Sequence, residues 1–192
     1  EVVPYKIGDT IYSLTHNIKL ASIDTLGNFI DFSISQQKNE RQFGFNEGSF
    51  VRPTVYINQF DSSLLNFEDY RGKYIFLDFW GTWCVPCKAV NPEVLNFKAE
   101  MEKSSFKNSI VFINIAWENG QPGNYKEQVN KYYNRWNSIL EFQEQKTGVV
   151  KQLHISSFPT FILLSPSRKI LLRKSGADQF ASFANNVKRI IK

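Results

Sequence analysis

The chain has 192 residues, of which 42% are hydrophobic and 15% aromatic, so it carries enough apolar side chains for a folded core and is not a disordered polypeptide. No apolar run approaches the roughly 20 residues that a helix needs to cross a bilayer. The net charge of +5 is scattered in small pairs such as Arg168–Lys169. This pattern favours a solvated basic surface and argues against a nucleic-acid-binding protein, in which basic residues gather on one face.

Residues 1–60 are predicted to form a β-rich N-terminal extension. The segments TIYSL, IKLASI and FIDFSI are rich in Ile and Phe and are separated by turn-forming residues such as Gly27 and Asn28. No pattern in this part indicates chemistry, and His16 is expected on the surface. The chain begins with Glu1 rather than Met, so we expect a mature or trimmed form from which any export signal has been removed.

From about Leu64 onward, strand and helix patterns alternate, so residues 61–192 are predicted to form one α/β domain. The segments KYIFLDFW (73–80) and SIVFINIAW (109–117) are near-continuous apolar runs, typical of strands buried on both faces. Between them, apolar residues recur at the spacing of one helix face: Val90, Val94, Phe97 and Met101.

The C-terminal part of this domain is predicted to contain further helices and a hairpin. Asn124 and Asp178 stand where they can cap two of these helices. The segments FPTFILL (158–164) and RKILLRK (168–174) flank Ser165-Pro166-Ser167, a predicted hairpin turn. Together the patterns predict a central mixed β-sheet, with parallel strands inside, an antiparallel pair at one side and helices on both faces.

The chain places its two cysteines, Cys84 and Cys87, shortly after the first buried strand, with two residues between them. A structural disulfide here would close a very short loop and contribute only about 2 kcal/mol. A zinc site needs about four ligands, and His16 and His154 lack the spacing to complete one. No metal site is therefore expected. A Cys-x-x-Cys pair near a β–α–β pattern is the specific signal for a redox dithiol.

The position of the pair supports redox chemistry. Cys84 stands where a strand ends and a helix begins, so unpaired N–H groups and the helix dipole favour its thiolate. Cys87 follows one turn later, where it can attack a mixed disulfide from within. The linker, Val85-Pro86, holds no His or Lys that would further lower the pKa of Cys84, which favours reduction of partners over their oxidation. The neighbouring Trp83 offers a flat contact surface.

The segments FLDFWGTWCVPCK, NPE and SFPTFILL resemble the thioredoxin superfamily, and the Gly-Lys-Tyr lead-in with the wording WCVPC is most similar to exported TlpA/ResA-type thiol–disulfide oxidoreductases. The resemblance covers about residues 64–192. It implies an α/β thioredoxin-like fold in which Cys84 attacks and Cys87 resolves. It also implies that Pro159 is a cis-proline facing the disulfide and that Asp78 is a buried proton carrier for the second cysteine.

The sequence departs from the family pattern around these residues. Val90 stands where ResA-type proteins have a glutamate, and Phe112 is the nearest match to the lysine that accompanies the buried acid of thioredoxin. Asp78 is then the nearby proton carrier, although a satisfied structural acid near the strand end is the alternative. Phe158 is bulky for the position before the cis-proline and is expected to narrow the groove and restrict partners.

The resemblance implies an exported, periplasmic enzyme that reduces protein disulfides, with Trp83, Val85, Pro86, Phe158 and Pro159 contacting the substrate. It needs no cofactor beyond the Cys84–Cys87 disulfide, and its expected partners are protein disulfide substrates and a thiol protein that donates electrons. No nucleic acid is expected. Membrane anchoring through a removed N-terminal segment stays open. A disulfide oxidase or isomerase and a non-catalytic thioredoxin-fold interaction module are the alternatives.

Overall fold

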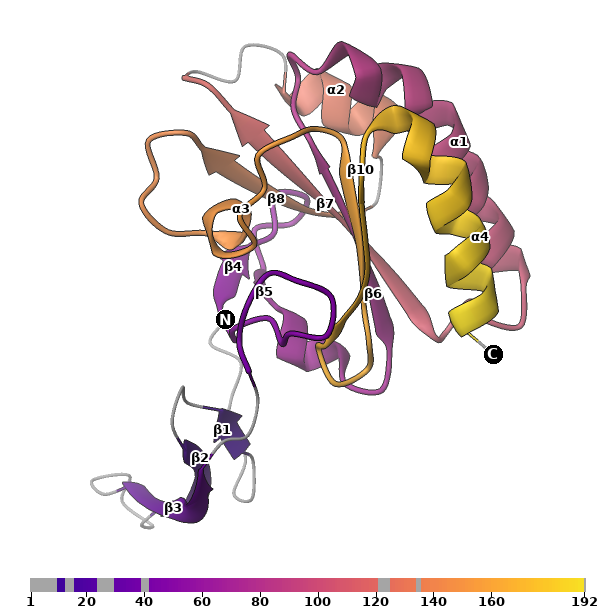
Figure 1. Cartoon of the computed structure of the whole chain (residues 1–192). Coiled ribbons are helices and arrows are strands. Elements are labelled where there is room, and N and C mark those ends of the chain that lie inside the picture. The colour runs from indigo at the N-terminus through magenta and orange to yellow at the C-terminus, as the bar shows by residue number, and fades with distance from the viewer. Residues whose placement is uncertain are drawn as a thin grey trace. The chain divides into compact units, whose positions relative to one another are not determined.

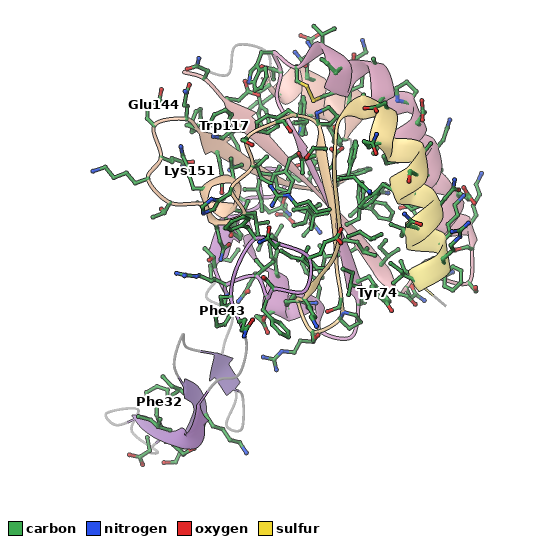
Figure 2. The ribbon with its side chains drawn as sticks, viewed as in Figure 1. Phe32, Phe43, Tyr74, Trp117, Glu144 and Lys151 are labelled. Carbon is green, nitrogen blue, oxygen red and sulfur yellow. A yellow bond between two sulfur atoms is a disulfide. The ribbon has the colours of Figure 1, made fainter. Side chains whose placement is uncertain are left out.

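The structure, a computed structural model, describes residues 10–12, 16–23, 30–38, 42–120, 125–133 and 136–191. The chain divides into two compact units, Glu1–Phe43 and Gly44–Lys192 (Figure 1). The first unit is a small antiparallel sheet in the order β1-β2-β3, made of β1 (Thr10–Tyr12), β2 (His16–Ile23) and β3 (Ile30–Lys38). This confirms the three strands expected near the N-terminus. Phe32 and Ile34 of β3 are exposed (Figure 2).

The boundary between the units lies earlier than the predicted one at residue 60. Backbone N–H groups of Gly48 and Val51 donate to the carbonyl oxygens of Ile170 and Arg168, at 2.8 and 3.0 Å, and Val51 is buried. Further on, β4 (Val55–Ile57) pairs with β5 (Leu64–Asn66). The predicted boundary is too late because the hydrogen bonds of Gly48 and Val51 join segments more than a hundred residues apart, which no local pattern reveals.

The second unit is built on a five-stranded mixed sheet in the order β10-β9-β6-β7-β8. Strands β6 (Tyr74–Trp80), β7 (Ile110–Glu118) and β8 (Asn137–Phe142) are parallel, with β8 at one edge of the sheet. Strand β9 (Thr160–Leu164) runs antiparallel to β6, and β10 (Ile170–Ser175) forms a hairpin with β9. The predicted mixed sheet is confirmed, with the antiparallel pair at one side.

Helices cover both faces of this sheet. They are α1 (Val85–Lys103), α2 (Tyr125–Tyr132), α3 (Val149–Gln152) and α4 (Phe180–Ile190), with short 3₁₀ helices at Phe67–Tyr70 and Ala177–Gln179. Side chains alternate along β6. Phe76 and Trp80 pack in one core with α1, α2 and α4, whereas Ile75, Leu77 and Phe79 pack in another with α3 and the β4–β5 hairpin. The predicted apolar face of α1 is confirmed, because Val90, Val94, Phe97 and Met101 are all buried.

The two predicted caps have different outcomes. Asp178 lies inside the second 3₁₀ helix, and the residue that precedes α4 is Gln179, which makes no side-chain capping bond. That prediction was wrong because a 3₁₀ helix directly precedes α4, so Gln179 and not Asp178 stands at the capping position. Asn124 lies outside the described residues.

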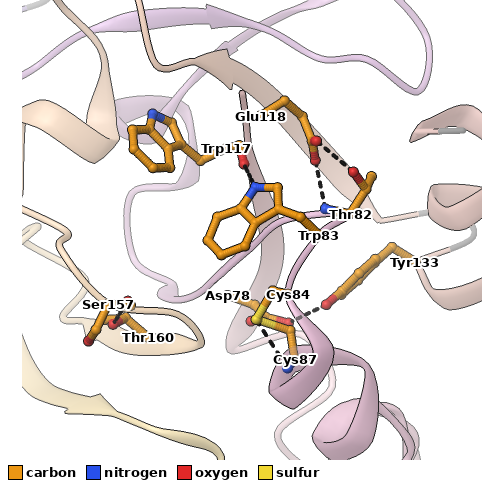
Figure 3. The surroundings of a disulfide bond; sticks show 10 residues. All are labelled: Asp78, Thr82, Trp83, Cys84, Cys87, Trp117, Glu118, Tyr133, Ser157 and Thr160. Atoms are coloured by element: carbon orange, nitrogen blue, oxygen red, sulfur yellow. Dashed lines mark hydrogen bonds between the residues drawn. A yellow bond between two sulfur atoms is a disulfide. The ribbon is translucent and has the colours of Figure 1, made fainter. Parts of the chain in front are cut away.

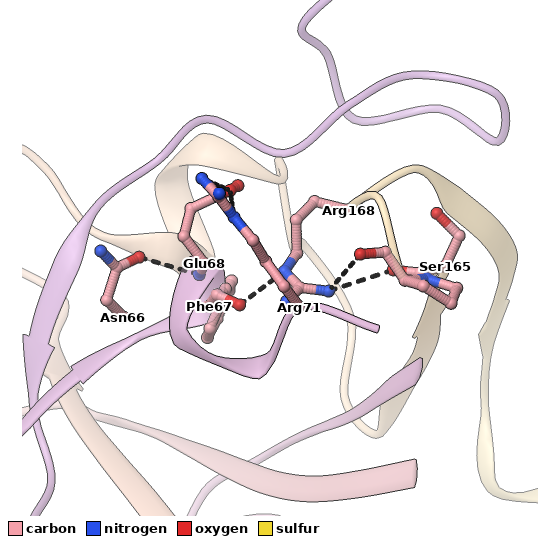
Figure 4. Close-up of polar contacts among 7 residues, drawn as sticks. Asn66, Phe67, Glu68, Arg71, Ser165 and Arg168 are labelled. Carbon is pink, nitrogen blue, oxygen red and sulfur yellow. Dashed lines mark hydrogen bonds and ion pairs between the residues drawn. The ribbon is translucent and has the colours of Figure 1, made fainter. Parts of the chain in front are cut away.

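The turn between β9 and β10 is held by a buried arginine. The Arg168 guanidinium donates to the carbonyl oxygens of Phe67, Lys73, Ser165 and Pro166, at 2.5 to 3.3 Å (Figure 4). It thereby ties this turn to the 3₁₀ helix and the segment that leads into β6. These hydrogen bonds fix the start of β6, the strand that leads to the cysteines.

Candidate redox site

The cysteines lie where the central strand β6 gives way to α1. Cys84 precedes the first helical residue, and its Sγ accepts a hydrogen bond from the Cys87 backbone N–H at 3.2 Å. The two sulfur atoms form a disulfide across a Cα–Cα distance of 5.3 Å. In this oxidised form both residues are buried, with 2% of Cys84 and 3% of Cys87 exposed.

The start of α1 suits a thiolate at Cys84. The helix is 19 residues long and its first turn, Val85-Pro86-Cys87-Lys88, contains no acidic residue. Pro86 is tolerated there because its missing N–H has no intrahelical partner in that turn. The unpaired N–H groups and the positive end of the dipole therefore face the sulfur of Cys84 without a competing negative charge.

A buried glutamate holds the loop before the cysteines. The Glu118 carboxylate, at the end of β7, accepts the Thr82 backbone N–H at 2.7 Å and the Thr82 hydroxyl at 2.6 Å (Figure 3). Strands β6 and β7 are parallel, so their carboxyl ends meet at one edge of the sheet. Glu118 thus fixes the loop two residues before Cys84.

Asp78 lies on β6, on the same face as Phe76 and Trp80, whose side chains share one core with both cysteines, and 2% of Asp78 is exposed. Its Oδ2 accepts a hydrogen bond from the Tyr133 hydroxyl at 2.9 Å (Figure 3). Burial raises the pKa of Asp78 from 3.8 to about 7, and the Tyr133 hydrogen bond opposes this rise because it stabilises the ionised form. An acid with such a pKa is able both to accept and to give a proton near neutral pH.

The neighbours of Asp78 differ from those that the sequence indicated. In the β6–β7 register, Asp78 lies opposite Asn114, and Phe112 lies opposite Phe76. The Asn114 amide is engaged elsewhere, because it accepts the Trp80 indole N–H at 3.1 Å and donates to the Ser138 hydroxyl at 2.6 Å. On α1, Val90 is buried and Glu93 is exposed.

An aromatic surface flanks the disulfide and consists of Trp83, Trp117 and Phe158. The Trp83 indole N–H donates to the Trp117 carbonyl oxygen at 2.9 Å (Figure 3). The Phe158 ring stacks on Trp117 and meets Trp83 edge-on, each with ring centroids 5.4 Å apart. Trp83 is 48% exposed and Val85 72% exposed, so both are open to a partner.

The loop before β9 completes the surroundings of the disulfide. The Phe158–Pro159 peptide bond is cis, and Pro159 is buried while Phe158 is half-buried. The Thr160 hydroxyl donates to the Ser157 carbonyl oxygen at 2.7 Å and closes this loop (Figure 3). The structure therefore brings the residues expected to contact substrate to one place: Trp83, Val85, Pro86, Phe158 and Pro159.

A family model described as thioredoxin-like matches residues 72–170, which include the cysteines, Asp78 and Pro159. The chain belongs to the thioredoxin-like family. Solved thioredoxin-like structures agree with the fold. The thioredoxin domain of a thiol–disulfide oxidoreductase from Bacteroides vulgatus is 20% identical with a TM-score of 0.63, over 77% of this chain and 99% of that one. A thiol–disulfide oxidoreductase from Bacteroides fragilis is 23% identical with a TM-score of 0.59, over 72% of this chain and 99% of that one.

Among thioredoxin-like relatives, the thiol–disulfide oxidoreductase ResA of Bacillus subtilis is 27% identical over 125 residues, which are 65% of this chain and 65% of that protein. The thioredoxin-like protein YneN of the same organism is 22% identical over 136 residues, or 71% of this chain and 75% of that protein. The chain thus spans just under two thirds of the length of the ResA proteins that it matches.

Three residues of this thioredoxin-like site escaped the sequence interpretation: Tyr133, Glu118 and Trp117. A partial signal existed for the last two, because both end the second parallel strand and so reach the same sheet edge as the cysteines. Tyr133 follows α2 and carries no such signal. In the part of the chain that the structure describes, no helix is long and apolar enough to cross a membrane, and no group of three His, Cys, Asp or Glu side chains is placed to hold a metal ion.

Proposed function

We propose that this protein is a thiol–disulfide oxidoreductase that reduces disulfide bonds in exported proteins. One observation carries the proposal: Cys84 of a Cys-x-x-Cys pair caps the N-terminus of a long helix, and a buried, protonatable aspartate lies on the core-facing side of the strand that leads to it. Thiol–disulfide exchange needs a stabilised thiolate, a second thiol within reach and a group that takes up a proton, and Cys84, Cys87 and Asp78 match these needs.

The first step forms a mixed disulfide. The Cys84 thiolate attacks one sulfur of the substrate disulfide, a new bond joins Cys84 to the substrate, and the other substrate sulfur leaves as a thiolate that takes a proton from water. The N-terminus of α1 stabilises the attacking anion. The position of Cys84 ahead of the helix gives it the attacking role.

The second step resolves this intermediate. Cys87 passes its thiol proton to the Asp78 carboxylate and attacks the Cys84 sulfur, so the Cys84–Cys87 disulfide forms and the second substrate thiolate leaves. Two electrons have then moved from the protein to the substrate. A donor thiol protein restores the dithiol by the reverse exchange, so the cycle uses the Cys84–Cys87 disulfide as its redox group and no further cofactor.

Substrate capture in this proposal takes place on the aromatic surface. The exposed Trp83 and Val85, with Pro86 beside them, contact the partner on one side of the disulfide, and Phe158 and Pro159 do so on the other. Protein disulfides persist in oxidising compartments, so a periplasmic or otherwise exported location, with or without a membrane anchor, fits this activity.

Two experiments test the proposal. One traps the mixed disulfide between the protein and its substrates, and the other measures whether the dithiol can reduce those substrates. A Cys87→Ser variant, incubated with an extract of oxidised exported proteins, should accumulate mixed disulfides through Cys84 that mass spectrometry identifies. A Cys84→Ser variant is the matched control and should trap none. A redox titration of the wild-type dithiol should give a potential that lets it reduce those trapped proteins. A potential as oxidising as that of a disulfide-forming catalyst, or equal trapping by both variants, would contradict the proposal.

A further inference from the structure

The buried acid of the redox site has a partner that the dithiol mechanism above leaves unused. Tyr133 is itself buried, and its hydroxyl donates a hydrogen bond to Asp78 Oδ2 at 2.9 Å. Its ring is held by two tryptophans, with centroids 4.7 Å from Trp80 and 5.2 Å from Trp136. The hydroxyl therefore has a fixed direction, set by packing rather than by the hydrogen bond itself.

We propose that Tyr133 is a positioning residue of the redox site: its hydroxyl binds one oxygen of the Asp78 carboxyl, sets how tightly that carboxyl holds a proton, and leaves the other oxygen to serve Cys87. The inference rests on the proposed function for its consequence in disulfide exchange. The contact itself stands independently of that function.

The groups on the elements around Asp78 leave control of its ionisation to Tyr133. Strand β7 presents Asn114 and strand β9 presents Phe161, neither of which titrates. Helix α1 presents the two cysteines. The nearest acid at the sheet edge, Glu118, is bound to Thr82, and Tyr125 of α2 packs on Trp80, with ring centroids 6.4 Å apart.

The hydroxyl and the carboxyl act on each other in opposite directions. Donation from Tyr133 stabilises the carboxylate and lowers the pKa of Asp78, against the larger rise that burial causes. Burial and the nearby Asp78 carboxylate in turn raise the pKa of Tyr133 well above 10, while the Asn91 amide acts on it in the lowering direction. Tyr133 is thus a permanent donor at physiological pH and never a competing base.

The consequence for exchange follows from the second step of the mechanism. Cys87 gives its proton to ionised Asp78, so resolution slows when the carboxyl is protonated. Loss of the Tyr133 hydroxyl destabilises the carboxylate and moves its ionisation to higher pH. Since a hydrogen bond to a charged group is worth more than one between neutral groups, resolution below neutral pH should slow about three- to tenfold.

Tyr133→Phe removes the hydroxyl and keeps the ring between the two tryptophans. Tyr125→Phe is a matched control, because Tyr125 is also a buried tyrosine against Trp80, and its hydroxyl has no hydrogen-bond partner among the described residues. The first readout needs no activity: the ¹³C shift of the Asp78 carboxyl, assigned with Asp78→Asn, is followed against pH in the oxidised full chain. Circular dichroism establishes that each variant is folded.

We expect Tyr133→Phe to shift the Asp78 titration upward and Tyr125→Phe to leave it in place. An unmoved titration in Tyr133→Phe, or an equal shift in both variants, overturns the inference. The second readout is the pH profile of mixed-disulfide resolution, whose acid limb should move in the same direction as the carboxyl titration. A shifted titration in a protein that exchanges no disulfides overturns the proposed function and leaves the role of Tyr133 toward Asp78 standing.

Discussion

Glu118 binds Thr82 through both of its carboxylate oxygens, one to the backbone N–H and one to the hydroxyl. This pair joins the end of β7 to the loop that follows β6, two residues before Cys84. A neutral glutamine at this position can accept the Thr82 backbone N–H with its one oxygen and donate to the hydroxyl, but it loses the negative charge that strengthens both hydrogen bonds. We therefore expect Glu118→Gln to lower the free energy of unfolding by about 1–3 kcal/mol, measured by urea denaturation of the oxidised protein.

The matched control is Glu102→Gln. Glu102 is an exposed acid on α1 that pairs with Lys98, and exposed ion pairs contribute only about 0–1 kcal/mol. Its removal should leave the unfolding midpoint nearly unchanged. Equal losses in the two variants would show that the Glu118–Thr82 contact adds nothing specific.

Gly81 is required by the close approach of Trp83 to β7. A Cβ at this position would lie 2.6 Å from Trp83 Nε1 and 2.8 Å from the Trp117 carbonyl oxygen, so Gly81→Ala must displace the indole and break its hydrogen bond. We expect the KM for a protein disulfide to rise about five- to thirtyfold, as the loss of 1–2 kcal/mol of binding implies. The rate with a small aromatic disulfide should change little, because it contacts less of the aromatic surface.

Gly72→Ala distinguishes this steric effect from backbone strain. Gly72 has a φ of +81°, and a Cβ there would meet no atom within 4 Å. The substitution should cost about 1 kcal/mol of stability through its strained backbone and leave the KM unchanged. A Gly81→Ala variant with the wild-type KM for protein disulfides would remove Trp83 from substrate capture.

The sequence predicted those parts of the site that depend on local patterns. Cys84, Cys87 and Asp78 sit on one strand–turn–helix segment, so an apolar run and a helix start were sufficient to place them. Their partners lie on other elements. Glu118 ends β7, which pairs with β6, and Tyr133 follows α2. Their sequence separations from Asp78 and Thr82 leave no periodic signal, and only the packed sheet brings them to the cysteines.

The same distinction between local patterns and long-range contacts explains the errors in the predicted fold. The strand segments and the apolar face of α1 followed from hydrophobic periodicity, whereas the boundary between the two units depends on hydrogen bonds from Gly48 and Val51 to the β10 region. The capping role expected for Asp178 failed because Asp178 itself is part of a 3₁₀ turn. Long-range pairing and tight turns both depend on tertiary context that a single sequence does not display.

Arg168 should be more important to stability than any surface arginine of the second unit. Its buried guanidinium donates to four carbonyl oxygens in two segments (Figure 4). Arg168→Lys keeps the charge and the same left-handed backbone, with its φ of +70°, but loses the planar set of donors. We expect a loss of about 2–4 kcal/mol in the free energy of unfolding. Arg71 pairs with Glu68 through a side chain that is 52% exposed, and Arg71→Lys should change the free energy of unfolding by less than about 1 kcal/mol. Similar values for both variants would contradict this role.

Asp78 should make the stability of the oxidised protein fall as the pH rises. Its pKa is about 7 in the folded protein and near 3.8 in the unfolded chain. Between these values the folded protein binds one more proton than the unfolded chain, so its contribution to stability is complete below about pH 4 and is lost as the pH rises through 7. At about 1.4 kcal/mol per pKa unit, the loss amounts to at most about 4 kcal/mol.

Asp78→Asn isolates this contribution. The asparagine Oδ1 accepts the Tyr133 hydroxyl as the carboxylate does, and it carries no charge to bury. We expect the variant to gain stability over the wild type as the pH is raised from 5 to 8, measured as the difference between urea unfolding curves at each pH. Titration of Glu141, whose pKa burial also raises, is common to both proteins and cancels in the difference. A difference that stays constant across this range would mean that the pKa of Asp78 lies below 5 in the folded protein, and so weak a base would be a poor acceptor for the Cys87 proton.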